Sequence, residues 1–310
     1  MNPTYNQFTF QAMGTPCEVQ FQPVSAAQDE EFKVVVAGWV EKFEQRFSRF
    51  VPESLISRAN AAAGIEAVAV GPEDEEILAL CDWFHWATQG VFDPALLPVI
   101  QLWDYHQPRN KTPDEGAVRD ALRLCGWKKV RREKGKLFLP EKGMGLDVGG
   151  IGKEYAVDRV FELAARRGIR NILVNFGRDL RVHGEPPEGG PWRIGLEDPA
   201  DQGRCWGGVA VHDRAVTTSG NYLRHFTVEG RQFGHILDPR SGYPVDNGCK
   251  SVSVIAPTCT EAGILSTTAF ILGGEAGLAF LDNYHQAEGC VTTTTHRYYT
   301  RRFHEYLITQ

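Results

Sequence analysis

The stretch from Leu146 to Asp158 holds the residue types best suited to chemistry in this chain. It reads LDVGGIGKEYAVD, so an acid, a glycine cluster and a lysine follow one another closely. Glycines let a bound anion approach the backbone, and the start of a helix presents free N–H groups to it. Lys153 adds a positive charge at the same place. The stretch therefore predicts contact with phosphate groups, although neither the P-loop pattern nor the G-x-G-x-x-G dinucleotide pattern fits it.

The elements that must position this stretch follow from periodicity and from cap signals. Helical spacing predicts helices over residues 29–47, 72–88, 94–103, 112–125, 154–167, 261–272 and 275–282. Strand patterns cover residues 8–13 and 17–21 around Gly14, then 130–146, 171–175 and much of 193–253. Because strands come in runs rather than in strict alternation with helices, the order favours an α+β fold. No linker or internal repeat is visible, so we expect a single domain over residues 1–310.

The second of these helices contains a run of large apolar side chains that we expect to lie in the core. This stripe consists of Leu78, Cys81, Trp83, Phe84 and Trp86.

The composition restricts the class of protein. The chain has 310 residues, 42% of them hydrophobic, and a net charge of −6, which argues against a general nucleic-acid binder. The basic run from Lys128 to Lys136 alternates around a glycine and is typical of a solvated hairpin. Seven scattered cysteines without a C-x-x-C pair indicate reduced thiols rather than a disulfide framework or a zinc site.

The first residues carry neither a basic start nor an apolar core, and no apolar run reaches the ~18 residues that span a membrane. As written, the chain is expected to be cytoplasmic and to have no membrane span. The trimmed mature form of an exported protein would look the same.

Several short motifs occur in one order along the chain. They are QAMGT at Gln11, a segment over 47–60 with Ser57 and Arg58, GVFDP at Gly90, the Asp147–Asp158 stretch, TSGNY at Thr218, HILDPRSGYP at His235 and LST at Leu265. This ordered set resembles the ApbE family of FAD:protein FMN transferases, from about Phe8 to Asp282. Any one motif would be weak evidence, whereas the ordered set is specific.

The resemblance implies an ApbE-like, T-fold-related α+β fold, with mixed sheets flanked by helices and an FAD cleft between two lobes. Family members cleave the pyrophosphate of FAD with Mg²⁺, attach FMN through a phosphoester to a threonine of a target flavoprotein, and release AMP. Some members instead hydrolyse FAD to FMN and AMP. The implied partners are FAD as substrate, Mg²⁺ and an acceptor flavoprotein with a modifiable threonine, without nucleic acid.

The resemblance also implies site residues. His235 is the implied base for the acceptor hydroxyl, a role suited to a group that titrates near neutrality. The backbone carbonyl of Gly150 and the hydroxyl of Thr267 are the implied metal ligands. Contacts with the flavin nucleotide are implied for Met13, Phe50, Phe92, Asp93, Asp147, Lys153 and Leu237.

Taken without the resemblance, several of these residues could equally have purely structural roles. His235 on its own is better explained as a histidine hydrogen-bonded within a sheet. Asp147 alone suits a helix cap or a turn, and Phe92 and Asp93 alone suit core or turn positions.

One position departs from the family pattern. The family has Ala-Asp-Ala-Leu-Ser-Thr, in which Asp and Thr at i and i+4 share a helix face and aim at one Mg²⁺. Here Gly263 replaces the aspartate and Thr267 is retained. Glu261 lies roughly 200° around the helix from Gly263 and is not expected to substitute. A helical glycine costs about 1 kcal/mol relative to alanine, and the sequence gives no local reason for it.

Three functions stay open at this point. The first is FMN transfer to a protein, which the intact motifs favour. The second is FAD binding with a degenerate metal site, which Gly263 favours. The third is a Mg²⁺-dependent FAD pyrophosphatase, in which water replaces the acceptor hydroxyl.

Overall fold

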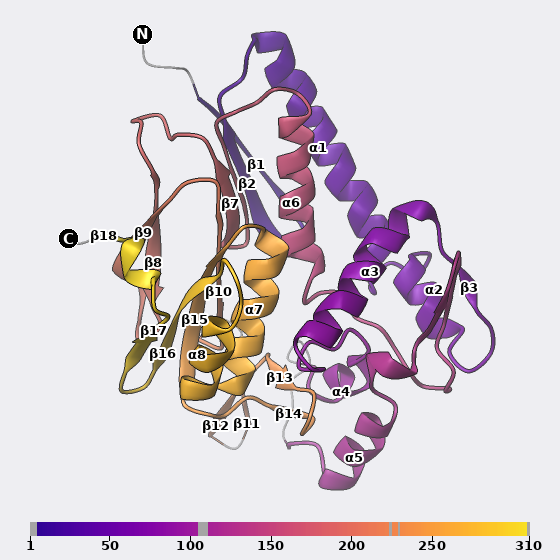
Figure 1. Cartoon of the computed structure of the whole chain (residues 1–310). Helices are drawn as coiled ribbons and strands as arrows, with labels where there is room; N and C mark the ends of the chain where they lie inside the picture. Colours follow the sequence, from indigo (N-terminus) through magenta and orange to yellow (C-terminus); the bar gives the residue numbers. More distant parts are fainter. Residues whose placement is uncertain (1–4, 105–110, 223–224, 229, 309–310) are drawn as a thin grey trace. The chain divides into compact units, whose positions relative to one another are not determined.

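The computed structural model describes residues 5–104, 111–222, 225–228 and 230–308 (Figure 1). Contacts divide the chain into two compact units. Unit 1 comprises Met1–Glu44, Lys153–Gly220 and Gly248–Gln310, and unit 2 comprises Gln45–Gly152 and Asn221–Asn247. Because the chain enters each unit more than once, neither is a continuous segment. The single domain over residues 1–310 stays a prediction.

Unit 1 is built on an eight-stranded sheet in the order β1-β2-β6-β7-β10-β15-β16-β17. Its strands are β1 (Asn6–Ala12), β2 (Thr15–Phe21), β6 (Ile172–Phe176), β7 (Asp179–His183), β10 (Ala215–Gly220), β15 (Cys249–Ala256), β16 (Glu288–Thr293) and β17 (Arg297–Tyr299). Every strand pair in the described part of this sheet is antiparallel. The expectation was the broader one of mixed sheets.

Alternation along the strands separates the two faces of this sheet. In β7, Leu180 and Val182 enter a core shared with a second sheet, while Arg181 faces helix α6 (Gly152–Ala165). The second sheet has the order β18-β9-β8, with β8 (Trp192–Asp198), β9 (Asp201–Val211) and β18 (Leu307–Ile308). Figure 1 shows α6, α1 (Ala26–Phe47) and α7 (Cys259–Leu272) on one side of the large sheet and β8 and β9 on the other.

Helix α7 is the central helix of unit 1. It contacts β10 and β15, and nearly all of its residues are buried, as expected for a helix that is apolar around its whole circumference. The Thr258 side chain caps its first turn by accepting the Glu261 N–H. Helix α8 (Gly274–Asp282) follows directly and packs against α7 and β16.

Unit 2 combines short helices with small sheets. Its helices are α2 (Leu55–Ala61), α3 (Pro72–Ala87), α4 (Leu97–Leu102), α5 (Glu115–Arg123) and the 3₁₀ turn η1 (Trp127–Lys129). Its strands are β3 (Val68–Ala69), β4 (Arg131–Glu133), β5 (Lys136–Phe138), β11 (His225–Val228), β12 (Arg231–Gly234), β13 (Leu237–Asp238) and β14 (Tyr243–Pro244). Trp103 lies at the centre of one core of this unit, where its indole N–H donates to the Gly242 carbonyl.

The structure confirms most of the expected elements and corrects two expectations. Helix α2 was not predicted, although Ser54 caps it by accepting the Ser57 N–H. The placement of Trp83 and Trp86 in the core was wrong, because these side chains are 53% and 70% exposed while Leu78, Cys81 and Phe84 are buried. The two indoles pack on each other instead, with ring centroids 5.1 Å apart.

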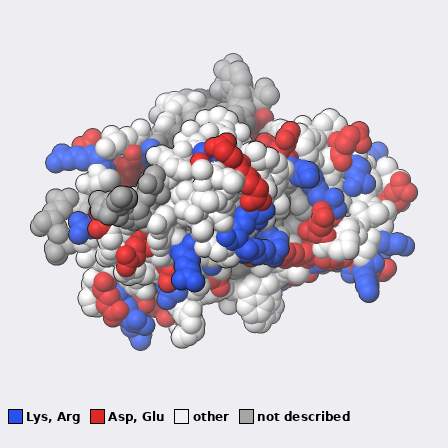
Figure 2. Space-filling view, turned by 90° about the horizontal axis from the view of Figure 1, so that it is seen from above, with Lys and Arg blue, Asp and Glu red and all other residues white. Residues whose placement is uncertain are grey.

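The surface and the cysteines agree with the composition. Figure 2 shows Lys and Arg side chains interspersed with Asp and Glu side chains over one face, rather than a broad basic area. All seven cysteines are free thiols, and only Cys205 is exposed. None of the helices in the described part of the chain combines the length and the apolar character needed to cross a bilayer.

Candidate functional site

Two carboxylates flank Lys153 at the start of α6. Its ammonium group pairs with Glu154 Oε1 at 2.9 Å and with Asp179 at the start of β7. All three side chains are largely buried, with 16%, 11% and 14% of their surface exposed. One cation against two anions leaves this group one negative charge in excess. The expected phosphate-binding lysine is thus held in place by acids.

Asp158 joins α6 to the start of α7. Its carboxylate accepts hydrogen bonds from the backbone N–H of Cys259 at 2.9 Å and of Thr260 at 2.8 Å, and also pairs with Arg181 at 2.8 Å. Since Glu154 precedes Asp158 by one turn and Gly263 follows Cys259 by one turn, this anchor brings Glu154 and Gly263 together.

Gly263 packs directly against the Glu154 side chain. A Cβ atom at position 263 would lie 2.5 Å from Glu154 Cγ and 3.3 Å from its Oε1. This packing is the local reason for the helical glycine, which the sequence did not provide. Any larger side chain at this position would displace Glu154.

Hydroxyl groups line the same helix one turn later. Thr267 Oγ1 and Ser219 Oγ lie 2.8 Å apart, and Ser219 also contacts Ser266 Oγ at 2.8 Å. Ser266 donates to the Gly263 carbonyl at 3.0 Å. Thr267, the expected metal ligand, is only partly buried, unlike most of α7. Its oxygen therefore belongs to an ordered polar network at the edge of the core.

In unit 2, Arg49 connects two expected flavin contacts. Its guanidinium group lies 4.1 Å from the centroid of the Phe50 ring and pairs with Asp147 Oδ2 at 2.6 Å. The Phe50 side chain is 72% exposed, so one face of the ring is supported by a fixed cation while much of its surface is free. Such an aromatic ring is suited to stacking on a planar ligand.

The glycine cluster forms a tight turn around Asp147. Asp147 Oδ1 accepts the Gly149 N–H at 2.6 Å, and a Cβ atom at Gly149 would lie 2.8 Å from that oxygen. Asn60 fixes the preceding residue, because its side chain exchanges hydrogen bonds with both backbone groups of Leu146. Gly150 is exposed, and a Cβ atom added there would meet the Phe92 ring at an ordinary contact distance of 3.8 Å. The backbone of Gly150 is accordingly accessible.

Phe92 and Asp93 have clear structural roles. The Phe92 ring packs on Phe84, and its carbonyl oxygen lies 2.9 Å from His85 Nδ1. Asp93 accepts the backbone N–H groups of Ala95 and Trp127. Burial raises the pKa of this carboxyl group despite those hydrogen bonds. Its role as a turn residue is established, and its contact with FAD stays a prediction.

Met13, Leu237 and His235 are the remaining expected residues. Met13 lies in the β1–β2 turn with a left-handed φ of 51°. Leu237 is buried in the unit 2 core, so its side chain serves packing and any ligand contact would fall to its backbone. His235 is half-buried between β12 and β13.

Among the described residues, no three His, Cys, Asp or Glu side chains gather as a metal-binding group. Mg²⁺ commonly needs only one or two carboxylates besides substrate phosphates and water. The buried Glu154 Oε2, which has no hydrogen-bond partner among the described residues, fits such a site.

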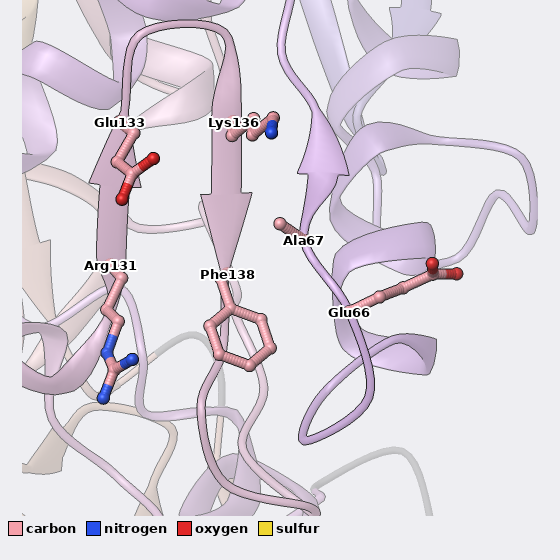
Figure 3. A pocket seen from close by; sticks show the side chains of 6 residues that line it. All are labelled: Glu66, Ala67, Arg131, Glu133, Lys136 and Phe138. Atoms are coloured by element: carbon pink, nitrogen blue, oxygen red, sulfur yellow. The ribbon is translucent and has the colours of Figure 1, made fainter.

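Unit 2 also contains a hollow of about 300 Å³. Figure 3 shows Arg131 and Glu133 of β4, Lys136 and Phe138 of β5, and the segment before β3 around it. None of the residues expected to bind FAD lines this hollow.

The structure thus brings together some of the expected residues and adds others. Asp147 and Phe50 are joined by Arg49, and Lys153 is joined to Glu154 and Asp179. Arg49, Glu154 and Asp179 were not singled out from the sequence. Glu154 stood inside the Leu146–Asp158 stretch, where its burial could have been suspected from the neighbouring apolar positions.

Known proteins resemble this chain along almost its whole length. The model of the ApbE family matches residues 13–291. The chain is 31% identical to an FAD:protein FMN transferase of Klebsiella pneumoniae, with 87% of this chain and 83% of that protein covered. It is 30% identical to one of Treponema pallidum, with 88% and 80% covered.

The solved structures agree. The ApbE protein of Thermotoga maritima is 26% identical and superposes with a TM-score of 0.89 over 98% of this chain and 99% of that one. The flavin transferase ApbE of Vibrio cholerae, 24% identical, has the same fold with a TM-score of 0.89 and the same coverage. The α+β class expected from the sequence is confirmed, and this chain is a member of the ApbE family.

Proposed function

We propose that this chain is an FAD:protein FMN transferase that uses Mg²⁺. In this reaction a threonine hydroxyl of an acceptor flavoprotein attacks the FMN phosphorus of FAD. A phosphoester bond forms, the P–O–P bond breaks, and AMP leaves. The match to the ApbE family over residues 13–291, with both of these relatives bearing this name, is the observation that carries the proposal.

The flavin part of the substrate is assigned to unit 2. The exposed Phe50 ring, supported by Arg49, offers a stacking surface for the isoalloxazine ring. Asp147 fixes the orientation of Arg49 and is itself fixed by the Gly149 N–H. Arg49 would add a positive charge near the nucleotide, and its ion pair with Asp147 already fixes the position of that charge.

The phosphate part is assigned to Lys153, at the first turn of α6. The ammonium group and the positive end of the helix dipole both favour phosphate oxygens. Because Glu154 and Asp179 hold Lys153 in place, little side-chain entropy is lost when phosphate binds. Bound Mg²⁺ would neutralise charge on the pyrophosphate oxygens. Thr267 and the Gly150 carbonyl stay its proposed ligands.

His235 is the proposed base for the acceptor hydroxyl. A histidine takes up a proton near neutral pH, as the attack by a threonine oxygen requires. The proposed roles of Met13, Phe92, Asp93 and Leu237 are contacts with FAD. Because the Leu237 side chain is buried, its contact would come from its backbone.

The test is release of AMP from FAD by the purified protein, with Mg²⁺ and after its removal with EDTA, beside a threonine-containing acceptor flavoprotein. We expect Mg²⁺-dependent AMP together with FMN on the acceptor. AMP with free FMN only, in the presence of an acceptor that another ApbE protein modifies, would assign hydrolysis instead. Bound but uncleaved FAD would refute the proposal.

A further inference from the structure

At this site of unit 1, the described residues leave one buried carboxylate oxygen unpaired. Glu154 is only 8% exposed, its Oε1 pairs with Lys153, and its Oε2 has no hydrogen-bond partner. Burying a charged oxygen without a partner is costly, so native structures rarely keep one without a reason. An oxygen of this kind is suited to a ligand that the protein itself does not supply.

The charges around Glu154 indicate which kind of ligand that is. Lys153 satisfies one oxygen of Glu154 and also pairs with Asp179, which leaves the three groups with one negative charge in excess. A second cation would correct this excess, and an anion would increase it. These charges favour a cation as the ligand of the unpaired oxygen.

The neighbouring atoms are hard oxygens. Thr267 lies one turn after Gly263 on the same face of α7, and its hydroxyl belongs to the network with Ser219. Glu154 packs directly on Gly263, with its Cγ 2.5 Å from where a Cβ atom would be. The Glu154 carboxylate and the Thr267 hydroxyl thus lie at adjacent turns of one helix face. Carboxylate and hydroxyl oxygens are the ligands that Mg²⁺ and Mn²⁺ prefer.

We propose that Glu154 supplies the carboxylate ligand of the catalytic divalent cation from α6, and that Gly263 is a glycine because this side chain must cross α7 at that point. The proposal rests on the function proposed above. It also replaces our expectation from the sequence that Gly263 leaves the metal site without a carboxylate. Asp158 acts as a positioning residue, since it holds α7 against α6 at the next turn.

Purely structural packing of Glu154 is the competing explanation, and the isosteric variant Glu154→Gln separates the two. Glutamine keeps the shape and can still accept from Lys153, but it lacks the negative charge. The measurement is binding of Mn²⁺ in the presence of FAD. Binding is detected directly after mixing as a loss of the EPR signal of free Mn²⁺. We expect affinity for Mn²⁺ to fall at least about tenfold in Glu154→Gln, because the loss of a group that only orients a ligand already costs about 10–100-fold and Glu154 is proposed as a ligand itself.

Moving the carboxylate between helices gives a second, independent test. The variant Glu154→Gly removes it, and the double variant Glu154→Gly with Gly263→Asp returns a carboxylate to the same space from α7. We expect the double variant to recover the Mn²⁺ affinity that Glu154→Gly loses, to within a few-fold of the wild type. The matched control, Glu154→Gly with Gly263→Ala, fills the space without a charge and should bind as weakly as Glu154→Gly alone.

The outcomes decide the inference separately from the proposed function. Unchanged Mn²⁺ affinity in Glu154→Gln, equal binding by the Asp and Ala double variants, or a wild type that binds no Mn²⁺ would each overturn it. AMP release from FAD is measured on the same samples. Mn²⁺ binding that depends on Glu154 without AMP release would sustain the inference and refute the function. AMP release that depends on Mn²⁺ but is unchanged in the Glu154 variants would support the function and refute the inference.

Discussion

Removal of the Asp158 carboxylate should destabilise unit 1 more than any surface change on the same helix. Asp158 is 7% exposed and accepts from the backbone N–H of Cys259 and Thr260 and from the Thr260 hydroxyl, while it pairs with Arg181. In Asp158→Ala, Arg181 loses its partner in a largely buried place and two helix N–H groups lose their acceptor.

The magnitude follows from these contacts. Breaking a buried ion pair by removing one partner costs about 3–5 kcal/mol. The cost of the lost helix cap is not added to this value, because the same carboxylate makes both contacts and their energies are not additive. We expect Asp158→Ala to lower the free energy of unfolding of unit 1 by about 3–5 kcal/mol. The control is Glu162→Ala, one turn later on α6, whose 41% exposed side chain pairs with Arg159 and Arg166. Exposed pairs of this spacing contribute only about 0.3–0.5 kcal/mol.

Urea unfolding measured by hydrogen exchange and mass spectrometry suits this comparison, because peptides from α7 report on unit 1 even if the two units unfold separately. The α7 amides should lose most of their protection in Asp158→Ala and keep it in Glu162→Ala. A loss in Asp158→Ala no larger than in Glu162→Ala would refute the claim that this carboxylate fixes α7.

Three further predictions concern FAD, transfer and the thiols. Phe50→Ala should weaken FAD binding about tenfold through lost stacking, measured by quenching of flavin fluorescence, whereas Trp86→Ala, another exposed aromatic of unit 2, should leave it unchanged. His235→Ala should reduce FMN transfer about 10²–10⁴-fold with FAD affinity nearly constant; normal transfer by this variant would show that another group is the base. Iodoacetamide at pH 8 should modify Cys205 alone in the folded protein, as counted by intact mass, because the other thiols are buried and burial raises the pKa of Cys17 to about 11 and of Cys249 to about 12. Rapid labelling of a second cysteine would contradict this packing of the thiols.

Local signals predicted the elements whose causes lie within a few residues. Pro72 and the acids after it indicated the start of α3, and the alternation around Gly14 indicated the β1–β2 hairpin. Helix α7 begins at Cys259, earlier than expected, since Thr258 caps it and Asp158 binds its first N–H groups. The first of these causes is local, and the second comes from a distant segment.

What the sequence did not reveal depends on contacts between distant segments. The reason for Gly263 lies in Glu154, which belongs to another helix. The exposure of Trp83 and Trp86 depends on which face of α3 the unit 2 core covers, and a helix with large apolar residues on several faces does not indicate this. The role of Arg49 requires Asp147 to reach it from a segment far along the chain.

The central claim is that this chain transfers FMN from FAD to a threonine of another protein, and the intact mass of an acceptor flavoprotein tests it most directly. The acceptor is incubated with the purified chain, FAD and Mg²⁺, beside a variant acceptor in which the modifiable threonine is valine. We predict that the wild-type acceptor gains the mass of one phosphoester-linked FMN and that the valine variant gains none. An unchanged mass for an acceptor that another ApbE protein modifies under the same conditions would contradict the account.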